Sequence, residues 1–370
     1  MIADSTTTRT GLRIPLKAAG LLQPAIRLGR FSAVWRPRMV LVAILSIAGA
    51  VIVSIFSLGI GDFALTPGTV VRALLGLGTP QEQLIVMTVR LPRILTGIAA
   101  GVALALAGAL MQSAARNALA SPDLLGVTAG ASAGAVAVIT LGGTASAGGF
   151  LREVGVPGAA LLGAAVATGL VFLLLGRTGV NGIQPLLVGI GVSAFFTGLV
   201  SWFLIAAPIK DAGRANVWLT GSINQRSWPE FWPIAIAVLV SVVVLIPIAH
   251  RLDAFALGLD IAKSVGIPIG RIGIAFVAIS VLLTAVSAAA VGPLGFVALV
   301  APHLARIASG ATRAPLIGSA AIGALVVAAS DLFARTLLAP IQLPAGAVIA
   351  VIGGPFLIWL LISQRRRTTA

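Results

Sequence analysis

The sequence predicts an all-α integral membrane protein of about ten transmembrane helices arranged as an inverted internal repeat. Of the 370 residues, 58% are hydrophobic and only 9% are charged, whereas soluble domains average about 25% charged residues. Uncharged runs close to the roughly 20 residues that span a bilayer recur along most of the chain. These runs are also interrupted at corresponding places in the two halves. Together these observations exclude a water-soluble core.

Ten apolar segments divide the region 38–363, which we interpret as one polytopic transmembrane domain. The segment at 293–305 is too short to cross a bilayer alone. In chain order the segments cover residues 41–58, 94–112, 124–142, 157–176, 185–209, 231–249, 272–291, 293–305, 314–330 and 343–363.

The net charge of +15 does not indicate a nucleic-acid-binding face, because the positions of the basic residues match the orientation of a membrane protein. With the N-terminus in the cytoplasm, seventeen of the 25 Lys and Arg residues fall on the cytoplasmic side and eight on the outer side. This bias follows the positive-inside rule. It predicts a multi-pass membrane protein with both termini inside and no nucleic-acid partner. Residues 1–37 lack the apolar core of a secretory signal, so 1–37 and 364–370 are interpreted as basic cytoplasmic tails.

Two interruptions support the internal repeat. The second segment ends at 114–122, which includes Pro122, and the seventh ends at 291–295, which includes Gly292 and Pro293. Paired interruptions of this kind are typical of repeats with opposite membrane orientation. Glycines spaced four apart, at Gly97 and Gly101, are assigned to close helix packing and not to substrate binding; the same holds for Gly126, Gly130 and Gly134.

The loop 210–230 on the predicted outer side carries tryptophans and charges. Trp218 and Trp228 beside Lys210 and Arg214 favour a short helix at the membrane interface. Simple anchoring at the interface explains this composition.

Several kinds of chemistry are absent from the sequence. No cysteine is present, and the two histidines, His250 and His303, lie in different segments, so no catalytic zinc site, metal site or cofactor site is expected. No GxxxxGK[ST] motif exists to bind ATP phosphates. Asp331 is the one acid placed well inside a segment, whereas an ion-coupled carrier usually needs several. The chain is therefore predicted to be a transport path without catalytic residues, driven by another protein.

From residue 90 to the C-terminus the sequence resembles the FecCD family, the permeases of iron-siderophore, haem and cobalamin importers. The resemblance rests on six blocks in the same order and spacing, including RLPRILTGIAAGVALALAGALMQ, GPLGFVALVAPHLAR and DLFAR. The blocks cover residues 90–112, 116–131, 255–258, 292–306, 331–335 and 343–361.

The resemblance implies a type II ATP-binding-cassette importer of a bacterial cell (plasma/inner) membrane. In this family ten helices form each subunit, and two permease subunits, alike or unlike, surround a central path. Two cytoplasmic ATPase subunits hydrolyse ATP, and an extracytoplasmic binding protein delivers the substrate. The partners implied are therefore a second permease, the ATPases, a siderophore-binding protein and membrane lipid.

The resemblance also implies three docking residues, Arg90, Arg93 and Arg335, which match family arginines that receive glutamates from the binding protein. Exposed guanidiniums pair with carboxylates in fork geometry and steer docking. The alternative is that these are interface arginines that reach toward the membrane surface.

The region 252–272 resembles the family's cytoplasmic coupling helices, which sit in a groove of the ATPase. Here Leu259 precedes Asp260, whereas acidic residues usually follow the glycine directly, and a plain loop is the alternative. The coupling residues implied are Asp253, Leu257, Gly258, Asp260 and Gly266.

The cytoplasmic end of the path is expected to be narrowed by two constrictions. Asn117 and Leu119 align with the first, with Ala118 where the family usually has proline. Asn181 and Gly182 are placed at the second. His303, a family signature, is assigned a structural role rather than that of a substrate ligand.

The function predicted is permease-mediated import of a ferric siderophore. The run 218–224 most resembles siderophore permeases that work as unlike pairs. Cobalamin or haem import remains an alternative within the family, and a secondary carrier driven by an ion gradient is the alternative from another class. The interpretation as a membrane enzyme is weakened because the sequence has no recognisable set of catalytic residues.

Overall fold

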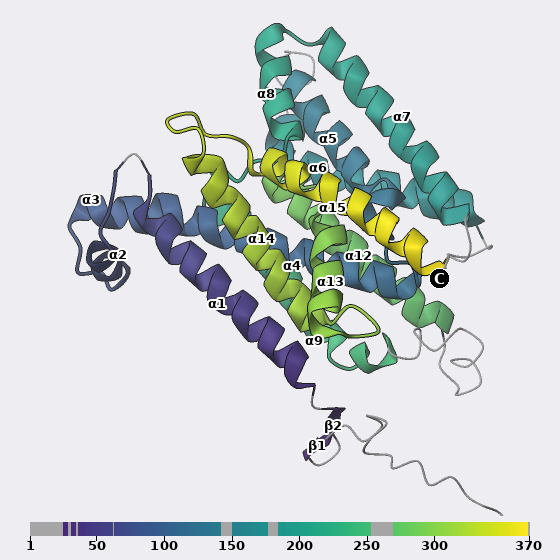
Figure 1. The fold of residues 1–370 in the computed structure, drawn as a ribbon. Coiled ribbons are helices and arrows are strands. Elements are labelled where there is room, and N and C mark those ends of the chain that lie inside the picture. Colours follow the sequence, from purple (N-terminus) through teal and green to yellow (C-terminus); the bar gives the residue numbers. More distant parts are fainter. Residues whose placement is uncertain are drawn as a thin grey trace, which may run out of the picture.

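The computed structural model describes residues 25–28, 31–34, 36–61, 63–141, 150–176, 184–252 and 269–368. Within these ranges the chain is a bundle of helices preceded by one hairpin (Figure 1). The hairpin strands β1 (Ala25–Leu28) and β2 (Phe31–Val34) pair in antiparallel orientation, within the segment predicted to be a tail.

Eight of the described helices are long and apolar enough to cross a membrane. They are α1 (Pro37–Gly59), α4 (Leu91–Ala114), α6 (Phe150–Leu175), α7 (Gln184–Ala206), α9 (Trp228–Leu245), α12 (Ile269–Val291), α14 (Leu316–Thr336) and α15 (Ala345–Thr368). Two shorter apolar helices are α5 (Val127–Leu141) and α13 (Val297–Ser309). The remaining elements are α2 (Pro67–Leu74), α3 (Pro80–Gln83), the π-helix η1 (Leu84–Arg90), α8 (Ile209–Leu219) and the 3₁₀ turns η2 (Pro122–Leu125) and η5 (Ala249–Arg251).

The ten apolar helices coincide with the ten predicted apolar segments, so the all-α membrane fold is confirmed. The predicted shortness of the segment at 293–305 is also confirmed, because α13 has 13 residues. The segment at 124–142 is shorter than predicted, since α5 has only 15 residues. Its first residues form the turn η2, which ends at Gly126 in the left-handed region with φ 76°. A short helix on the loop 210–230 is present as α8.

Helices α4 and α12 form the centre of the bundle, because most of their residues are buried, whereas most of α1 is exposed. Helix α4 packs against α9, α12, α13 and α14, and α5 packs against α6 and α7. The crossings with α4 depend on small residues. A Cβ on Gly101 would overlap the carbonyl oxygen of Gly323 in α14, and a Cβ on Gly323 would overlap that of Gly101. Such contacts allow the close backbone approach that membrane helices use in place of hydrophobic drive.

Helices α4 and α12 run in opposite directions and are each followed by a break and a short helix. The Ser280 hydroxyl donates to the carbonyl of Ala107 at 2.7 Å in the middle of the pair. Gly97, near the start of α4, lies against Ile223, and the neighbouring Ser222 donates its N–H to Val291 at the end of α12. The breaks lead into α5 and α13 respectively. This arrangement is what an inverted repeat requires.

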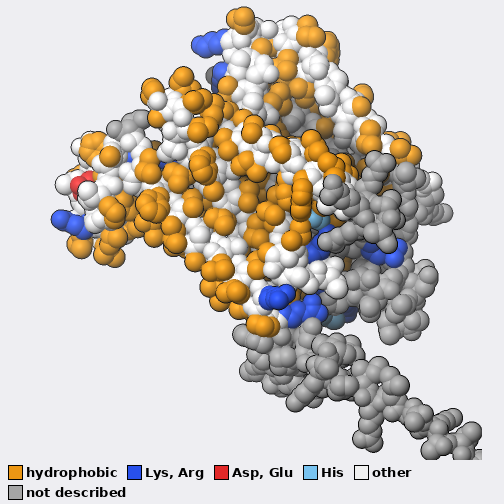
Figure 2. Space-filling view, in the orientation of Figure 1, with side chains coloured by type: hydrophobic (Ala, Val, Ile, Leu, Met, Phe, Trp, Pro, Cys, Tyr) orange, Lys and Arg blue, Asp and Glu red, His pale blue; other side chains and the backbone are white. Residues whose placement is uncertain are grey.

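The outer faces of the bundle are apolar. Large hydrophobic side chains of α1, α7, α9 and α15 are exposed, and Figure 2 shows hydrophobic side chains over the broad middle of the molecule, with Lys and Arg toward its edges. Exposed apolar faces of this extent fit contact with lipid or with another membrane subunit.

Candidate functional site

Arg93 lies in the first turn of α4 and is bound to Asp331 of α14. Its Nη2 lies 2.8 Å and its Nε 3.2 Å from the same carboxylate oxygen, Oδ1. The Asp331 residue is only 3% exposed and Arg93 only 8%. A charge-assisted contact with two N–H groups fixes both position and orientation of the guanidinium.

The third nitrogen of the Arg93 guanidinium, Nη1, binds two loops. It donates to Asn224 Oδ1 at 2.9 Å, in the connection between α8 and α9. The same nitrogen donates to Gln342 Oε1 at 3.2 Å, in the connection between α14 and α15. Arg93 therefore joins two helices and two loops that are far apart in the sequence.

Arg335 approaches the other oxygen of Asp331. Its Nε lies 3.4 Å from Oδ2, and its side chain is 8% exposed. Its Nη2 donates to the backbone carbonyl of Ser57 at 3.2 Å and also contacts the Ser57 hydroxyl. The guanidinium thus ties α14 to the last turns of α1.

Arg90 binds the same end of α1. Its Nη1 donates to the carbonyl of Leu58 at 2.6 Å and its Nη2 to that of Phe63 at 2.5 Å. The last carbonyls of a helix have no partner within the helix and carry the negative end of its dipole. A guanidinium is a suitable donor for them. We call Arg90, Arg93, Asp331 and Arg335 the arginine cluster.

The structure corrects the expectation that the three arginines expose their guanidiniums, because the side chains of all three are largely buried. The physical reason is that Asp331 and carbonyl groups at and just after the end of α1 provide ion-pair and hydrogen-bond partners inside the bundle. A role in docking stays a prediction. Sequence reasoning missed the Asp331–Arg335 pair, although the spacing of four residues in a helix was an available signal.

A π-helix, η1, leads directly into the cluster and ends at Arg90. π-helical turns are rare and occur frequently at functional sites. No sequence pattern predicted this turn.

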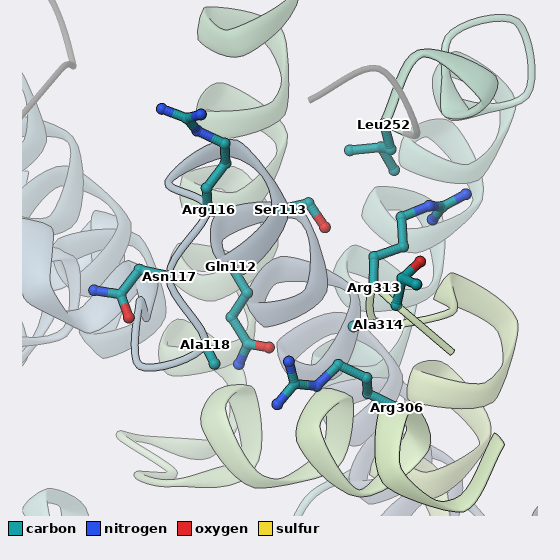
Figure 3. Close-up of a pocket in the computed structure, with 10 residues that line it drawn as sticks. Gln112, Ser113, Arg116, Asn117, Ala118, Leu252, Arg306, Arg313 and Ala314 are labelled. Carbon is teal, nitrogen blue, oxygen red and sulfur yellow. The ribbon is translucent and has the colours of Figure 1, made fainter. Parts of the chain in front are cut away.

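The opposite end of α4 opens on a basic pocket of about 210 Å³. Arg93 and Gln112 are nineteen residues apart, which is about 28 Å at 1.5 Å per residue, close to the thickness of a bilayer core. Figure 3 shows Gln112 and Arg306 directed toward one another across the pocket, with Arg116 and Arg313 farther out. Gln112 is buried, and its amide donates to the carbonyl of Leu299 at 3.3 Å.

The predicted first constriction lies beside this basic pocket. Asn117 and Ala118 line it, whereas Leu119 does not. Asn117 accepts the N–H of Leu119 through Oδ1 at 2.9 Å, so its side chain holds the turn that follows α4. Arg116 has a positive φ of 50°, at a helix C-terminus where glycine is usual.

Asp123 lies on the turn η2 that follows this constriction. Burial raises the pKa of its carboxyl group, while hydrogen bonds from Ser121 and Thr128 act in the opposite direction. The hydroxyl of Ser121 donates to Oδ2 at 3.0 Å.

His303 is buried in α13 and contacts side chains of its own helix and of α15. Its Nδ1 lies 3.2 Å from Nη2 of Arg306, and its ring meets the edge of Phe356 at 5.8 Å between centroids. These contacts suit the predicted structural role. The described residues hold no group of three or more His, Cys, Asp or Glu that could bind a metal ion.

Two sets of predicted site residues lie outside the described residues. One is the coupling set Asp253, Leu257, Gly258, Asp260 and Gly266, and the other is the second constriction, Asn181 and Gly182. Their roles stay predictions.

Comparison with known proteins places these features in a family. Residues 49–363 match the FecCD transport family. The ferric enterobactin transport system permease protein FepG of Escherichia coli (strain K12) is 34% identical, covering 89% of this chain and 98% of FepG. The achromobactin transport system permease protein CbrC of Dickeya dadantii (strain 3937) is 35% identical, covering 92% of this chain and 96% of CbrC.

The fold is also that of a solved transporter. A metal-chelate type ABC transporter in an inward-facing conformation superposes with a TM-score of 0.74 at 27% identity, covering 87% of this chain and 99% of that one. The family match spans most of the chain, and the sequence and structural likenesses cover nearly the whole of it. The protein therefore belongs to the FecCD transport family.

Proposed function

We propose that this chain is the membrane-spanning permease subunit of an ABC importer for ferric siderophores. The observation that carries the proposal is the family match over residues 49–363, together with relatives whose names are those of siderophore transport permeases. The chain forms the path, and separate subunits supply ATP hydrolysis and substrate capture. A second permease, alike or unlike, completes the path.

Each end of the bundle has its own role in this proposal. The arginine cluster forms the outer end and receives carboxylates of the binding protein. Asn117, Leu119, Asn181 and Gly182 narrow the cytoplasmic end, and the region 252–272 engages the ATPase. The arrangement is supported by the length of α4, which separates the cluster from the basic pocket by about one bilayer thickness.

Uptake of a radiolabelled ferric siderophore into proteoliposomes tests the function. Transport should require the ATPase, the binding protein and ATP together. Uptake that is driven by an ion gradient and is indifferent to ATP would instead identify a secondary carrier.

The orientation of the chain is tested by reporter fusions. A reporter fused after Ala370 should be active only on the cytoplasmic side, because most Lys and Arg residues fall there when both termini are inside. A reporter inserted at Gly76, before α3, should be active only on the outer side. A periplasmic signal from the C-terminal fusion would overturn the topology.

Gly258→Val tests the coupling region. The family resemblance implies a tight turn at Gly258, and a β-branched side chain is poorly tolerated where φ is positive. The complex should still bind the loaded binding protein but lose stimulated ATPase activity and uptake. Gly198→Val on α7, outside the region 252–272, is the matched control, since nothing lies within 4 Å of a Cβ added at Gly198. Full stimulated ATPase activity in Gly258→Val would remove the coupling role from this segment.

A further inference from the structure

The arginine cluster already contains a carboxylate where a docking partner would place one. Arg93 and Arg335 approach opposite oxygens of Asp331, at 2.8 Å and 3.4 Å. Within the described part of the chain, Asp331 is the one carboxylate paired with either of them.

The cavity between Arg93 and Asp331 has no room for a second carboxylate. The cavity beside Arg93 and Asp331 measures about 10 Å³, which is at the lower limit for a single water molecule. A carboxylate from outside could reach both arginines only if Asp331 released them.

We propose that Asp331 is a resident counter-ion that competes with the carboxylates of the binding protein for Arg93 and Arg335. This inference rests on the proposed docking role of the cluster. Docking is then an exchange of one carboxylate for another rather than contact with exposed guanidiniums. Removing one partner of a buried ion pair is costly, so the arginines release Asp331 only as the carboxylates of the binding protein take its place. Asp331 therefore lowers the docking affinity and keeps the cluster closed when no binding protein is present.

The exchange of carboxylates also affects the centre of the bundle. Arg93 holds Asn224 and Gln342, so a shift of its guanidinium loosens both loops. The first loop is attached to the end of α12 through the N–H of Ser222 and the carbonyl of Val291, at 2.9 Å. It is attached to the start of α15 through the N–H of Gly346 and the carbonyl of Gly221, at 3.0 Å. Release of Asp331 thus couples docking to helices α12 and α15.

Asp331→Asn removes the competing charge while keeping the shape of the side chain. The equilibrium affinity of the assembled transporter in lipid nanodiscs for its loaded binding protein should increase about tenfold or more, the scale of a close charge pair at an interface. Asp211→Asn is the matched control. It removes one negative charge from a partly exposed pair on α8, where Asp211 lies 3.7 Å from Arg214, and should change the affinity little.

Gln342→Glu provides the opposite test and does not depend on the stability of Asp331→Asn. Gln342 is exposed and already contacts Arg93, so a glutamate of the same shape adds a second resident carboxylate. Docking should weaken about tenfold. Asn216→Asp adds the same charge to an exposed position on α8 that does not contact the cluster, and it should have a much smaller effect.

The outcomes separate this inference from the docking role itself. Tighter docking in Asp331→Asn, or weaker docking in Gln342→Glu but not in Asn216→Asp, supports the exchange. If Asp331→Asn folds and docks no more tightly, Asp331 is only structural. If Asp331→Asn fails to fold, equal effects of Gln342→Glu and Asn216→Asp overturn the exchange. If neither cluster variant changes the affinity, and Arg93→Gln in the Asp331→Asn background also docks normally, the cluster is not the docking site.

Discussion

Arg93→Glu is expected to remove most of the folded permease from the membrane. The substitution places a second carboxylate against Asp331, which is 3% exposed, in place of a guanidinium at 2.8 Å. Breaking a buried ion pair costs about 3–5 kcal/mol even before the new repulsion is counted. Whole domains are stable by only about 5–15 kcal/mol. The measurement is the amount of detergent-extracted permease that elutes as a folded species, together with its melting temperature.

Two further variants make this expectation specific to the cluster. The double variant Arg93→Glu with Asp331→Arg restores a pair of opposite charges and should recover part of the lost protein. Arg214→Glu, on an exposed pair whose Arg side chain is 69% exposed, should change stability by less than about 1 kcal/mol. Wild-type yield and melting temperature in Arg93→Glu alone would show that the pair does not stabilise the fold.

The buried cluster changes how docking can be tested. If these arginines lay on the surface, reversing their charge would weaken the contact with a binding protein and leave the fold intact. Since Arg93 holds two helices and two loops inside the bundle, its reversal disturbs folding and docking together. Variants at Gln342, which is exposed and isosteric with glutamate, separate the two effects.

Hydropathy was sufficient to predict the ten apolar helices. A helix that faces lipid or packs in a membrane core carries few charges over about 20 residues, and this requirement is visible in each run separately. The exact length of α5 was not predictable in the same way. Its start is fixed by the turn at Pro122 and the left-handed Gly126, which are features of backbone conformation rather than of hydropathy.

The geometry of the site could be predicted only in part. Family resemblance identified Arg90, Arg93 and Arg335, but their burial depends on contacts such as Arg93 with Asp331, which are 238 residues apart in the chain. A single sequence carries no signal for such a pair. It does carry one for Asp331 and Arg335, four residues apart on α14, because side chains at this spacing share a helix face.

Glycine spacing predicted close packing of α4 but missed its tightest contact. The spacing of four residues pointed to Gly97 and Gly101. In the structure a Cβ on Gly97 would meet only side chains, those of Ile223 and Val327, whereas one on Gly108 would meet the backbone of α13 at Ala298. The difference matters because a side chain can rotate away from an added methyl group, whereas a helix backbone cannot.

Gly108→Ala is therefore expected to destabilise the permease although alanine is the better helix former. Alanine favours an isolated helix by about 0.8–1 kcal/mol over glycine. In this bundle the new Cβ would overlap the carbonyl oxygen of Ala298, and overpacking of this kind typically costs about 1–3 kcal/mol and occasionally more. Helix α13 would have to move away from α4, which would also stretch the hydrogen bond of 3.3 Å between the Gln112 amide and the carbonyl of Leu299.

Gly198→Ala on α7 is the matched control for this prediction. Nothing lies within 4 Å of a Cβ added at Gly198, so only the gain in helix propensity remains, and stability should be unchanged or slightly higher. Melting temperatures of both variants in the same detergent measure the comparison. Gly108→Ala is expected to lower the melting temperature, whereas the same chemical change at Gly198 should leave it unchanged or raise it slightly. A Gly108→Ala variant as stable as Gly198→Ala would mean that α4 and α13 do not approach at Gly108 as closely as the structure has them.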